Sequence, residues 1–304
     1  MSDLATRHSP LATSALPRIS LVTPVYNSAK YIEQTIQSVL AQNYPNLEYF
    51  IIDGGSTDGT LDIIRKYEPQ ISGWLSEPDK GMYDALNKGF ARTSGEVMGW
   101  ISATDQLHTG GLAVVGSVFR DLPKVKWITG RPTLFNEEGM TVEIGNVPHW
   151  SRTRFLAGAN RYIEQESTFW RRSLWEKAGS RTDSSCRNGA DFELWVRFFR
   201  HAKLYPVDAL IGGFRAHSDS LGLTNMDEVH RTHDAYIQAE LDTAPWGKSI
   251  RLFRGANRII QPIPVARWFW NRFVIGGLYH ARARDWAPVI KYNRTDGKFS
   301  IVAD

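Results

Sequence analysis

The first part of the chain alternates apolar runs of strand length with amphipathic stretches. Apolar residues spaced three and four apart predict a helix, and a short apolar run between turn residues is typical of a buried strand. We therefore expect strands at 18–23, 47–52, 71–75 and 97–101, and helices at 27–41, 58–67, 81–92 and 109–119. Asn27 and Ser28 are the expected caps of the first helix. Successive strand–helix units predict a mostly parallel, Rossmann-like sheet flanked by helices, an α/β fold.

The pattern becomes less regular after residue 126. Short strands are expected at 126–129, 133–135, around 163–169 and at 211–215, and helices at 173–178 and 190–201. Beyond residue 223 the chain reads as helical, with prolines as punctuation. We expect a loose tail at 1–17, one α/β domain at 18–222 with halves at 18–105 and 106–222, and a helical C-terminal extension at 223–304.

Composition is that of a soluble globular protein. Of the 304 residues, 42% are hydrophobic and 22% charged, and the single cysteine, Cys186, gives no sign of a disulfide or of an oxidising compartment. Residues 1–17 are polar and broken by prolines, unlike a signal peptide, and no apolar stretch has the length of a membrane span. We expect a cytoplasmic protein.

The positive charge is concentrated at the C-terminal end. From residue 246 to residue 304 there are eleven Lys and Arg against three Asp, a balance of +8, so a total of +4 leaves −4 for the rest. The acidic body and the lack of a nucleic-acid motif argue against a nucleic-acid partner.

Four acidic residues follow or end predicted strands: Asp53, Asp79, Asp105 and Asp191. In an open α/β sheet, the carboxyl ends of the strands form the edge at which ligands bind. Carboxylates gathered there repel one another unless a cation or hydrogen-bond donors compensate, and a divalent cation holding phosphates would do so. For each residue alone, capping a helix or stabilising a turn is the simpler role.

The order of these motifs resembles that of the family 2 inverting glycosyltransferases, which have the GT-A fold. The resemblance runs from about residue 19 to residue 221. It is carried by Thr23-Pro24-Val25-Tyr26-Asn27, Asp53-Gly54-Gly55-Ser56-Thr57-Asp58-Gly59-Thr60, the segment 76–89, Gly99-Trp100-Ile101-Ser102-Ala103-Thr104-Asp105 and Asn188-Gly189-Ala190-Asp191.

The resemblance implies a pocket for a nucleoside-diphosphate-sugar in the first half of the domain. Thr23, Pro24, Val25 and Asn27 would line the base and ribose pocket, and Asp53 would accept a hydrogen bond from the base. Asp79 and Lys80 lie where the family contacts the nucleotide-sugar; a solvated turn is the alternative for Lys80. UDP-sugars are favoured, although guanosine and thymidine donors also occur in the family.

The acidic metal motif of the family is altered in this chain. Where the family has two adjacent acids, this chain has Thr104 followed by Asp105. The resemblance implies that Asp105 ligates Mn²⁺ or Mg²⁺ and that Thr104 contacts the ribose or a metal-bound water. With one acid fewer we expect a weaker metal site, with more reliance on Lys80 and on His217 as a ligand or diphosphate contact. A structural role for His217 is the alternative.

The same resemblance makes Asp191 the general base for the acceptor hydroxyl, with its nearest rival, Glu193, on another face of the helix. Arg215 could contact the diphosphate. The segment 165–170 matches a strand on the acceptor side, near the active site.

The C-terminal extension combines tryptophans with arginines. The stretch 263–279 is apolar but interrupted by Arg267 and Arg272. This composition suits a helix lying in the interface of an anionic membrane, which would make the protein peripheral on the inner face of the cytoplasmic membrane. The alternative is a pair of helices packed on the α/β domain with solvated arginines.

Together these features predict an inverting, metal-dependent glycosyltransferase. It would move a sugar from a nucleoside-diphosphate-sugar to a hydroxyl of a saccharide or lipid-linked acceptor, in the synthesis of cell-surface polysaccharide or glycolipid. A catalytically silent nucleotide-sugar-binding protein is the main alternative. A nucleotidyltransferase is disfavoured, because no glycine-rich, lysine-containing triphosphate loop lies near the N-terminus.

Overall fold

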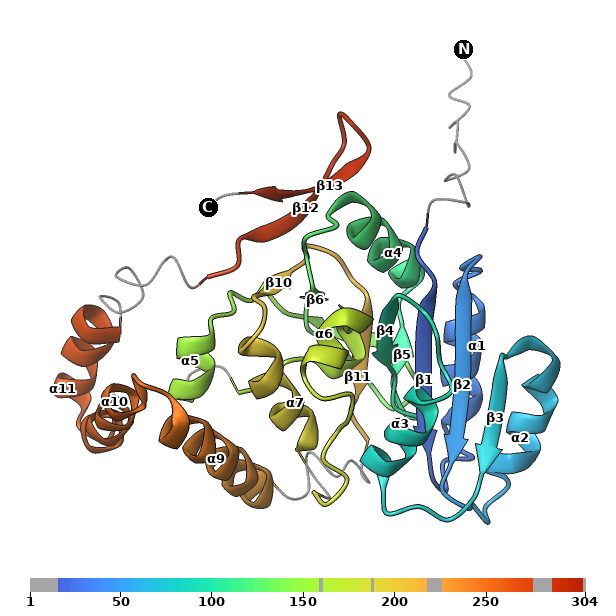
Figure 1. Cartoon of the computed structure of the whole chain (residues 1–304), viewed down its shortest axis with the longest axis horizontal. Helices are drawn as coiled ribbons and strands as arrows, with labels where there is room; N and C mark the ends of the chain where they lie inside the picture. The colour runs from blue at the N-terminus through green and yellow to red at the C-terminus, as the bar shows by residue number, and fades with distance from the viewer. Residues whose placement is uncertain (1–15, 159–160, 187–188, 218–225, 276–285, 303–304) are drawn as a thin grey trace.

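A mixed seven-stranded sheet is the centre of the computed structural model, which describes residues 16–158, 161–186, 189–217, 226–275 and 286–302 (Figure 1). The strand order is β10-β6-β9-β4-β1-β2-β3. Its strands are β1 (Ile19–Val25), β2 (Leu47–Asp53), β3 (Gly73–Ser76), β4 (Val97–Trp100), β6 (Trp127–Thr129), β9 (Thr168–Arg171) and β10 (Leu204–Pro206). Strand β9 alone is antiparallel to its neighbours, so the predicted mostly parallel α/β sheet is confirmed.

Helices cover both faces of this sheet. They are α1 (Ile32–Leu40), α2 (Thr60–Tyr67), α3 (Met82–Phe90), α4 (Gly111–Asp121), α5 (Arg152–Ala157), α6 (Arg172–Lys177) and α7 (Ala190–Phe199). A smaller sheet has the order β5-β11-β7-β8, with β5 (Gln106–Leu107), β7 (Thr133–Phe135), β8 (Thr141–Ile144) and β11 (Gly212–Arg215). Of these, β5, β8 and the helix α5 were not predicted, because each is short and has no clear periodicity.

The first helix begins later than the sequence predicts. Helix α1 starts at Ile32 with Tyr31 at its N-cap, and no side chain caps it. The expected caps are wrong: Asn27 is exposed with a φ of 46°, and its side-chain oxygen accepts a hydrogen bond from the amide of Thr57. Asn27 therefore joins two loops at the sheet edge instead of starting a helix.

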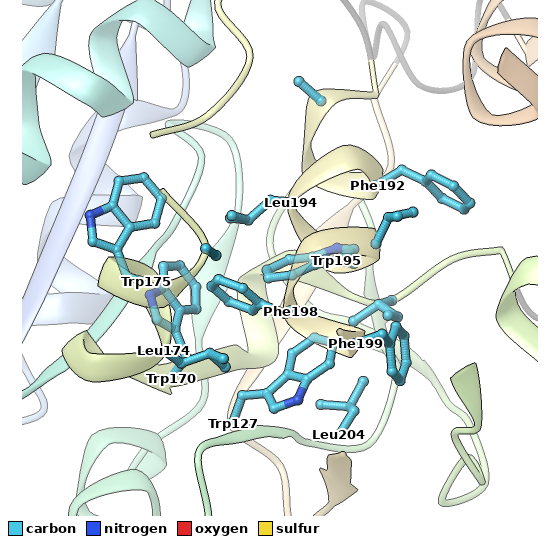
Figure 2. Packing of buried hydrophobic residues seen from close by; sticks show 14 of the residues in the cluster. Trp127, Trp170, Leu174, Trp175, Phe192, Leu194, Trp195, Phe198, Phe199 and Leu204 are labelled. Carbon is cyan, nitrogen blue, oxygen red and sulfur yellow. The ribbon is translucent and has the colours of Figure 1, made fainter. Parts of the chain in front are cut away.

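Tryptophans dominate the core on the side of the sheet covered by α7. Trp195 of α7 stacks on Trp100 of β4, with ring centroids 5.6 Å apart and planes 5° apart, and on Trp127 of β6. Phe192 and Phe198 of the same helix are also buried (Figure 2). The aromatic face of α7 thus holds the helix against the sheet. Asp191 lies in the first turn of this helix.

The C-terminal extension begins with helices and ends in a hairpin. The helices are α9 (Met226–Thr243), α10 (Gly247–Ile260) and α11 (Pro264–Phe269), followed by the π-helical η4 (Trp270–Ile275). The expectation of helix throughout 223–304 is wrong for β12 (Val289–Asn293) and β13 (Lys298–Val302). These strands pair with each other, and Ile290 bridges to Val207 beside β10. The predicted tail at 1–17 lies outside the described residues, except for the buried Leu16 and for Pro17.

Helix α9 packs on the α/β domain. Its residues Ile237 and Leu241 are buried, and its Glu240, also buried, accepts hydrogen bonds from Arg152 (2.6 Å) and Arg200 (2.5 Å). Among the described residues, no helix combines the length and the apolar character that crossing a bilayer requires.

Replacing Trp195 by Ala should lower the free energy of unfolding by about 3–5 kcal/mol, because it leaves a large cavity among stacked rings. Trp268→Ala removes the same side chain from an exposed position and should change the free energy of unfolding by less than about 0.5 kcal/mol. Urea denaturation of both variants measures the difference; equal losses would contradict this packing.

Candidate functional site

Two loops lie side by side where β1 and β2 end. The amides of Asn27, Ser28 and Ala29 donate to side-chain oxygens of Ser56 (2.7 Å), Thr60 (2.9 Å) and Asp58 (3.0 Å) respectively. Parallel pairing of β1 with β2 places both loops at one sheet edge, toward which the arrowheads of β2 and β3 point in Figure 1. This edge is the ligand-binding edge expected for an open α/β sheet.

The predicted base-pocket residues differ in exposure. Thr23, Pro24 and Val25 are buried, and the hydroxyl of Thr23 lies 3.0 Å from that of Tyr49. The side chain of Thr23 therefore lies in the interior of the domain. Asn27 is exposed beside the loop of Asp53.

Asp53 is fully buried and stabilises its own turn. Its carboxylate accepts hydrogen bonds from the amides of Gly55 and Ser56, both at 3.0 Å, and from the hydroxyls of Ser56 and Ser76. These contacts support the turn-stabilising role for Asp53 and supply no direct evidence for a base contact.

Asp79 lies over the backbone next to Asp53. A Cβ built on Gly54 would be 2.8 Å from the Asp79 carboxylate, so a larger residue at position 54 would require this carboxylate to move. Burial raises the pKa of Asp79, whereas the hydrogen bond from the Gly81 amide (2.7 Å) lowers it. Lys80 is exposed, and its side chain is free to reach a ligand at this edge.

Asp105 is buried where β4 has ended and connects three segments. Its Oδ1 accepts from the backbone amide of Arg215 (3.0 Å), and its Oδ2 accepts from the side-chain amide of Gln165 (3.1 Å). Thr35 of α1 donates to the carbonyl oxygens of Ala103 and Asp105. Burial raises the pKa of Asp105 to about 7, although hydrogen bonds from the Arg215 amide and the Ser102 hydroxyl and the charge of Arg215 lower it. Thr104 is half-buried beside it.

Asp191 lies in the first turn of α7, beside the first turn of α3. Its Oδ1 accepts a hydrogen bond from the hydroxyl of Tyr83 (3.2 Å). Burial raises the pKa of Asp191, and the Phe192 amide and the Tyr83 hydroxyl lower it. Because Tyr83 follows Asp79 by four residues, Asp191 and Asp79 lie at the same end of α3.

Two glutamates that were not predicted as site residues connect Asp105 with Asp191. Burial, together with a smaller contribution from the charge of Asp191, raises the pKa of Glu164 to about 7. Burial also holds the pKa of Glu166 well above its usual range, with added contributions from Glu164, Asp105 and Asp191. The four carboxylates therefore form one electrostatic group, which we call the acidic cluster.

Arg215 places a buried guanidinium next to the acidic cluster. Its side chain is stacked over Tyr31, and its Nη1 donates to Gln34 (2.6 Å) and to the carbonyl of Glu137 (3.0 Å). Its Nε and Nη2 are buried without a hydrogen-bond acceptor among the described residues. His217 lies nearby, with its ring centroid 4.9 Å from that of Tyr31. A buried cation with two unused donor groups is suited to bind an anion.

The donor atoms near Asp105 fit a divalent ion only in part. Within the described residues, no three side chains of His, Cys, Asp or Glu are grouped closely enough to hold a metal. Asp105 accepts hydrogen bonds from the Arg215 amide, the Gln165 side chain and the Ser102 hydroxyl, and a carboxylate has about four lone-pair sites, so one remains for a cation. A metal held here would need most of its ligands from a phosphate-bearing substrate and from water.

A family-level comparison matches a segment in the first half of the chain. Residues 20–125 match the family model described as Glycosyl transferase family 2. The resemblance drawn from the motifs is therefore confirmed for this segment of the chain.

Similar proteins carry glycosyltransferase names. An uncharacterized glycosyltransferase of Mycobacterium tuberculosis is 33% identical over 173 residues, which cover 55% of this chain and 63% of that protein. A Bacillus subtilis glycosyltransferase named for teichuronic acid biosynthesis is 38% identical over 97 residues, covering 31% of this chain and 38% of that protein. The chain thus spans less than two thirds of the length of these relatives.

Solved structures share the fold at low sequence identity. Staphylococcus aureus TarS in complex with UDP-GlcNAc has a TM-score of 0.59 and 17% identity, covering 75% of this chain and 67% of that one. The mannosyltransferase PcManGT from Pyrobaculum calidifontis, in complex with GDP-Man and Mn²⁺, has a TM-score of 0.53 and 16% identity, covering 86% and 81%. The predicted GT-A fold is confirmed.

The raised pKa of Glu164 predicts a pH-dependent stability. The folded chain holds a proton that the unfolded chain releases above the ordinary pKa of 4.5, so the free energy of unfolding should fall as pH rises from about 4.5 through 7. In Glu164→Gln this part of the fall should be absent. Urea denaturation at several pH values tests this, with the exposed Glu143→Gln as control; parallel curves for all three proteins would contradict it.

Proposed function

We propose that the chain is an inverting glycosyltransferase that uses a nucleoside-diphosphate-sugar donor. The observation that carries this proposal is the acidic cluster, in which the family's metal-site position, Asp105, and its base position, Asp191, are linked through two glutamates. The family of residues 20–125 and the donor complexes of proteins with the same fold support it.

In the proposed reaction, Asp191 removes the proton of the acceptor hydroxyl as that oxygen attacks the anomeric carbon. Burial makes the Asp191 carboxylate a stronger base than a solvated one, and Tyr83 orients it through a hydrogen bond. Attack from the face opposite the leaving diphosphate inverts the anomeric configuration, through a transition state with positive charge on the sugar ring. The other carboxylates stabilise that charge.

The donor is proposed to bind at the loops after β1, β2 and β3. Asn27 and Lys80 are exposed there, and Thr23, Pro24, Val25, Asp53 and Asp79 shape the edge beneath. A UDP-sugar is the preferred donor, with GDP-sugars as the alternative. Arg215 has two unused donor groups with which to bind the diphosphate.

Mn²⁺ or Mg²⁺ is proposed to be held by Asp105, with Thr104 or His217 as additional contacts. Such an ion supplies charge neutralisation of the departing diphosphate. Arg215 and Lys80 add positive charge for the same purpose. Their charge compensates for the weaker metal binding expected from the missing acid at position 104.

The acceptor is proposed to be a hydroxyl of a saccharide or of a lipid-linked saccharide. Relatives named for teichuronic acid biosynthesis and as chondroitin synthase support a role in polysaccharide synthesis. A cytoplasmic location with peripheral attachment to the membrane is proposed with it.

Replacing Asp191 by Asn should lower turnover about 10²- to 10⁴-fold, because the acceptor proton loses its base, while donor affinity stays nearly unchanged. Steady-state transfer and donor titration measure the two quantities. Glu193→Gln, two residues further along α7, is the control and should retain activity. Unchanged turnover in Asp191→Asn would remove this residue from the mechanism.

Replacing Thr104 by Asp should restore the second acid and raise the apparent affinity for Mn²⁺ by about tenfold, because charge count tunes such sites. A Mn²⁺ titration of donor binding measures this, with Thr109→Asp as a control at an exposed position. Identical titrations for both variants would place the metal elsewhere.

The altered metal motif is the observation that favours a silent nucleotide-sugar-binding protein as the second candidate. Such a protein would be stabilised against heat by a nucleoside diphosphate. It would show neither transfer nor donor hydrolysis with any metal.

A further inference from the structure

Several of the most exposed apolar side chains in the described part of the chain lie on α10, α11 and η4. Leu252 is 76% exposed, Ile259 72%, Val265 70% and Phe273 61%. Trp268 and Phe269 are exposed between them. We call residues 247–275 the C-terminal ridge. An exposed apolar surface of this kind indicates a binding partner.

The ridge is held firmly to the rest of the chain on its other side. Ile250 is buried, and Arg254 donates to Asp234 of α9 (2.5 Å) and to the carbonyl of Leu156 (3.2 Å). No residue of α11 is buried. Contacts of α10 with α9 and α5 hold this helix on the domain and leave the side chains of Leu252 and Ile259 exposed.

The charge of the ridge selects the kind of partner. Residues 247–275 contain six Lys and Arg and no Asp or Glu. Arg251 and Arg254 pair with Asp242 and Asp234, whereas Lys248, Arg258, Arg267 and Arg272 have no ion pair within the described residues. Four unpaired cations beside apolar and aromatic side chains are complementary to a surface that is anionic outside and apolar beneath.

A hollow on the ridge is suited to a single anionic group. It is lined by Pro264, Arg267, Trp268, Asn271 and Arg272, and it is open to solvent. Its polar groups are two guanidinium groups and one side-chain amide. All three donate hydrogen bonds, and only the amide oxygen can accept one. The flanking Trp268 offers a ring of the kind that is enriched at membrane–water interfaces.

We propose that the C-terminal ridge lies in the interface of an anionic bilayer and that the hollow between Arg267 and Arg272 binds a phospholipid phosphate. The exposed side chains of Leu252, Ile259, Val265 and Phe273 enter the acyl boundary, and the unpaired cations remain at headgroup level. The proposal deepens the peripheral attachment given above and rests on it. It is independent of glycosyl transfer, because vesicle binding needs no donor.

Flotation of the full chain with vesicles tests this directly. The chain should bind vesicles of phosphatidylcholine and phosphatidylglycerol at low salt, and it should bind pure phosphatidylcholine much more weakly. R267Q/R272Q should weaken binding to the anionic vesicles about 30-fold. V265S/F273S should weaken it at least tenfold.

Matched controls remove the same charge and the same apolar area elsewhere. K124Q/K298Q and V142S/I144S change exposed residues outside the ridge and should bind as the wild type does. Loss of binding in K124Q/K298Q equal to that in R267Q/R272Q would overturn the proposal, because net charge alone would then explain binding.

Other outcomes also decide the proposal. If the chain binds inorganic phosphate but does not bind vesicles, the proposal is overturned in favour of a soluble anion as the ligand. Concentration-dependent dimerisation that V265S/F273S abolishes, without vesicle binding, would assign the ridge to a second copy of the chain. Thermal unfolding at the wild-type temperature shows that each variant is folded.

Discussion

The candidate site depends on one constraint: the carboxyl group of Asp105 is buried inside the domain. Donors from two distant segments, the amide of Arg215 and the side chain of Gln165, offset part of the cost of desolvating Asp105. These contacts bring β11 and the turn before β9 to the end of β4. The acidic cluster and the buried guanidinium of Arg215 follow from that arrangement.

The aromatic core provides the second support. Trp195 and its neighbours hold α7 against the sheet, while α9 packs on the outside of α7 through a stacked contact between His233 and Phe192. Asp191 thus begins a helix that is packed on both sides. A carboxylate held in this way loses little orientational freedom when a ligand binds. The C-terminal ridge continues from α9, at the opposite end of the molecule from β3 and α2 (Figure 1).

The parallel half of the fold could be predicted because its signals are local. Strands β1, β2 and β4 are apolar runs, glycines follow β2 and precede β4, and the helices have regular apolar spacing. The start of α1 was mispredicted because Asn27 and Ser28 bind the neighbouring loop, a contact between segments about thirty residues apart. The hairpin of β12 and β13 was missed because charged and turn residues dominate that segment.

The candidate site divides in the same way. Asp105 and Asp191 are recognisable from their motifs, whereas the importance of Glu164 and Glu166 arises from tertiary packing that raises their pKa. The run Ile163-Glu164-Gln165-Glu166 carried a signal, since two acids beside apolar residues are unusual before a buried strand. The effect of burial on the pKa of Glu164 and Glu166 follows only from the folded structure.

Calorimetric titration of UDP and GDP in the presence of Mn²⁺, into the wild-type chain, Asp105→Asn and Asp191→Asn, tests the central claim most directly. The account predicts that one of these nucleotides binds the wild type and Asp191→Asn with similar Kd and binds Asp105→Asn at least about tenfold more weakly. Equal affinity in all three proteins, or no binding of either nucleotide to the wild type, would contradict it.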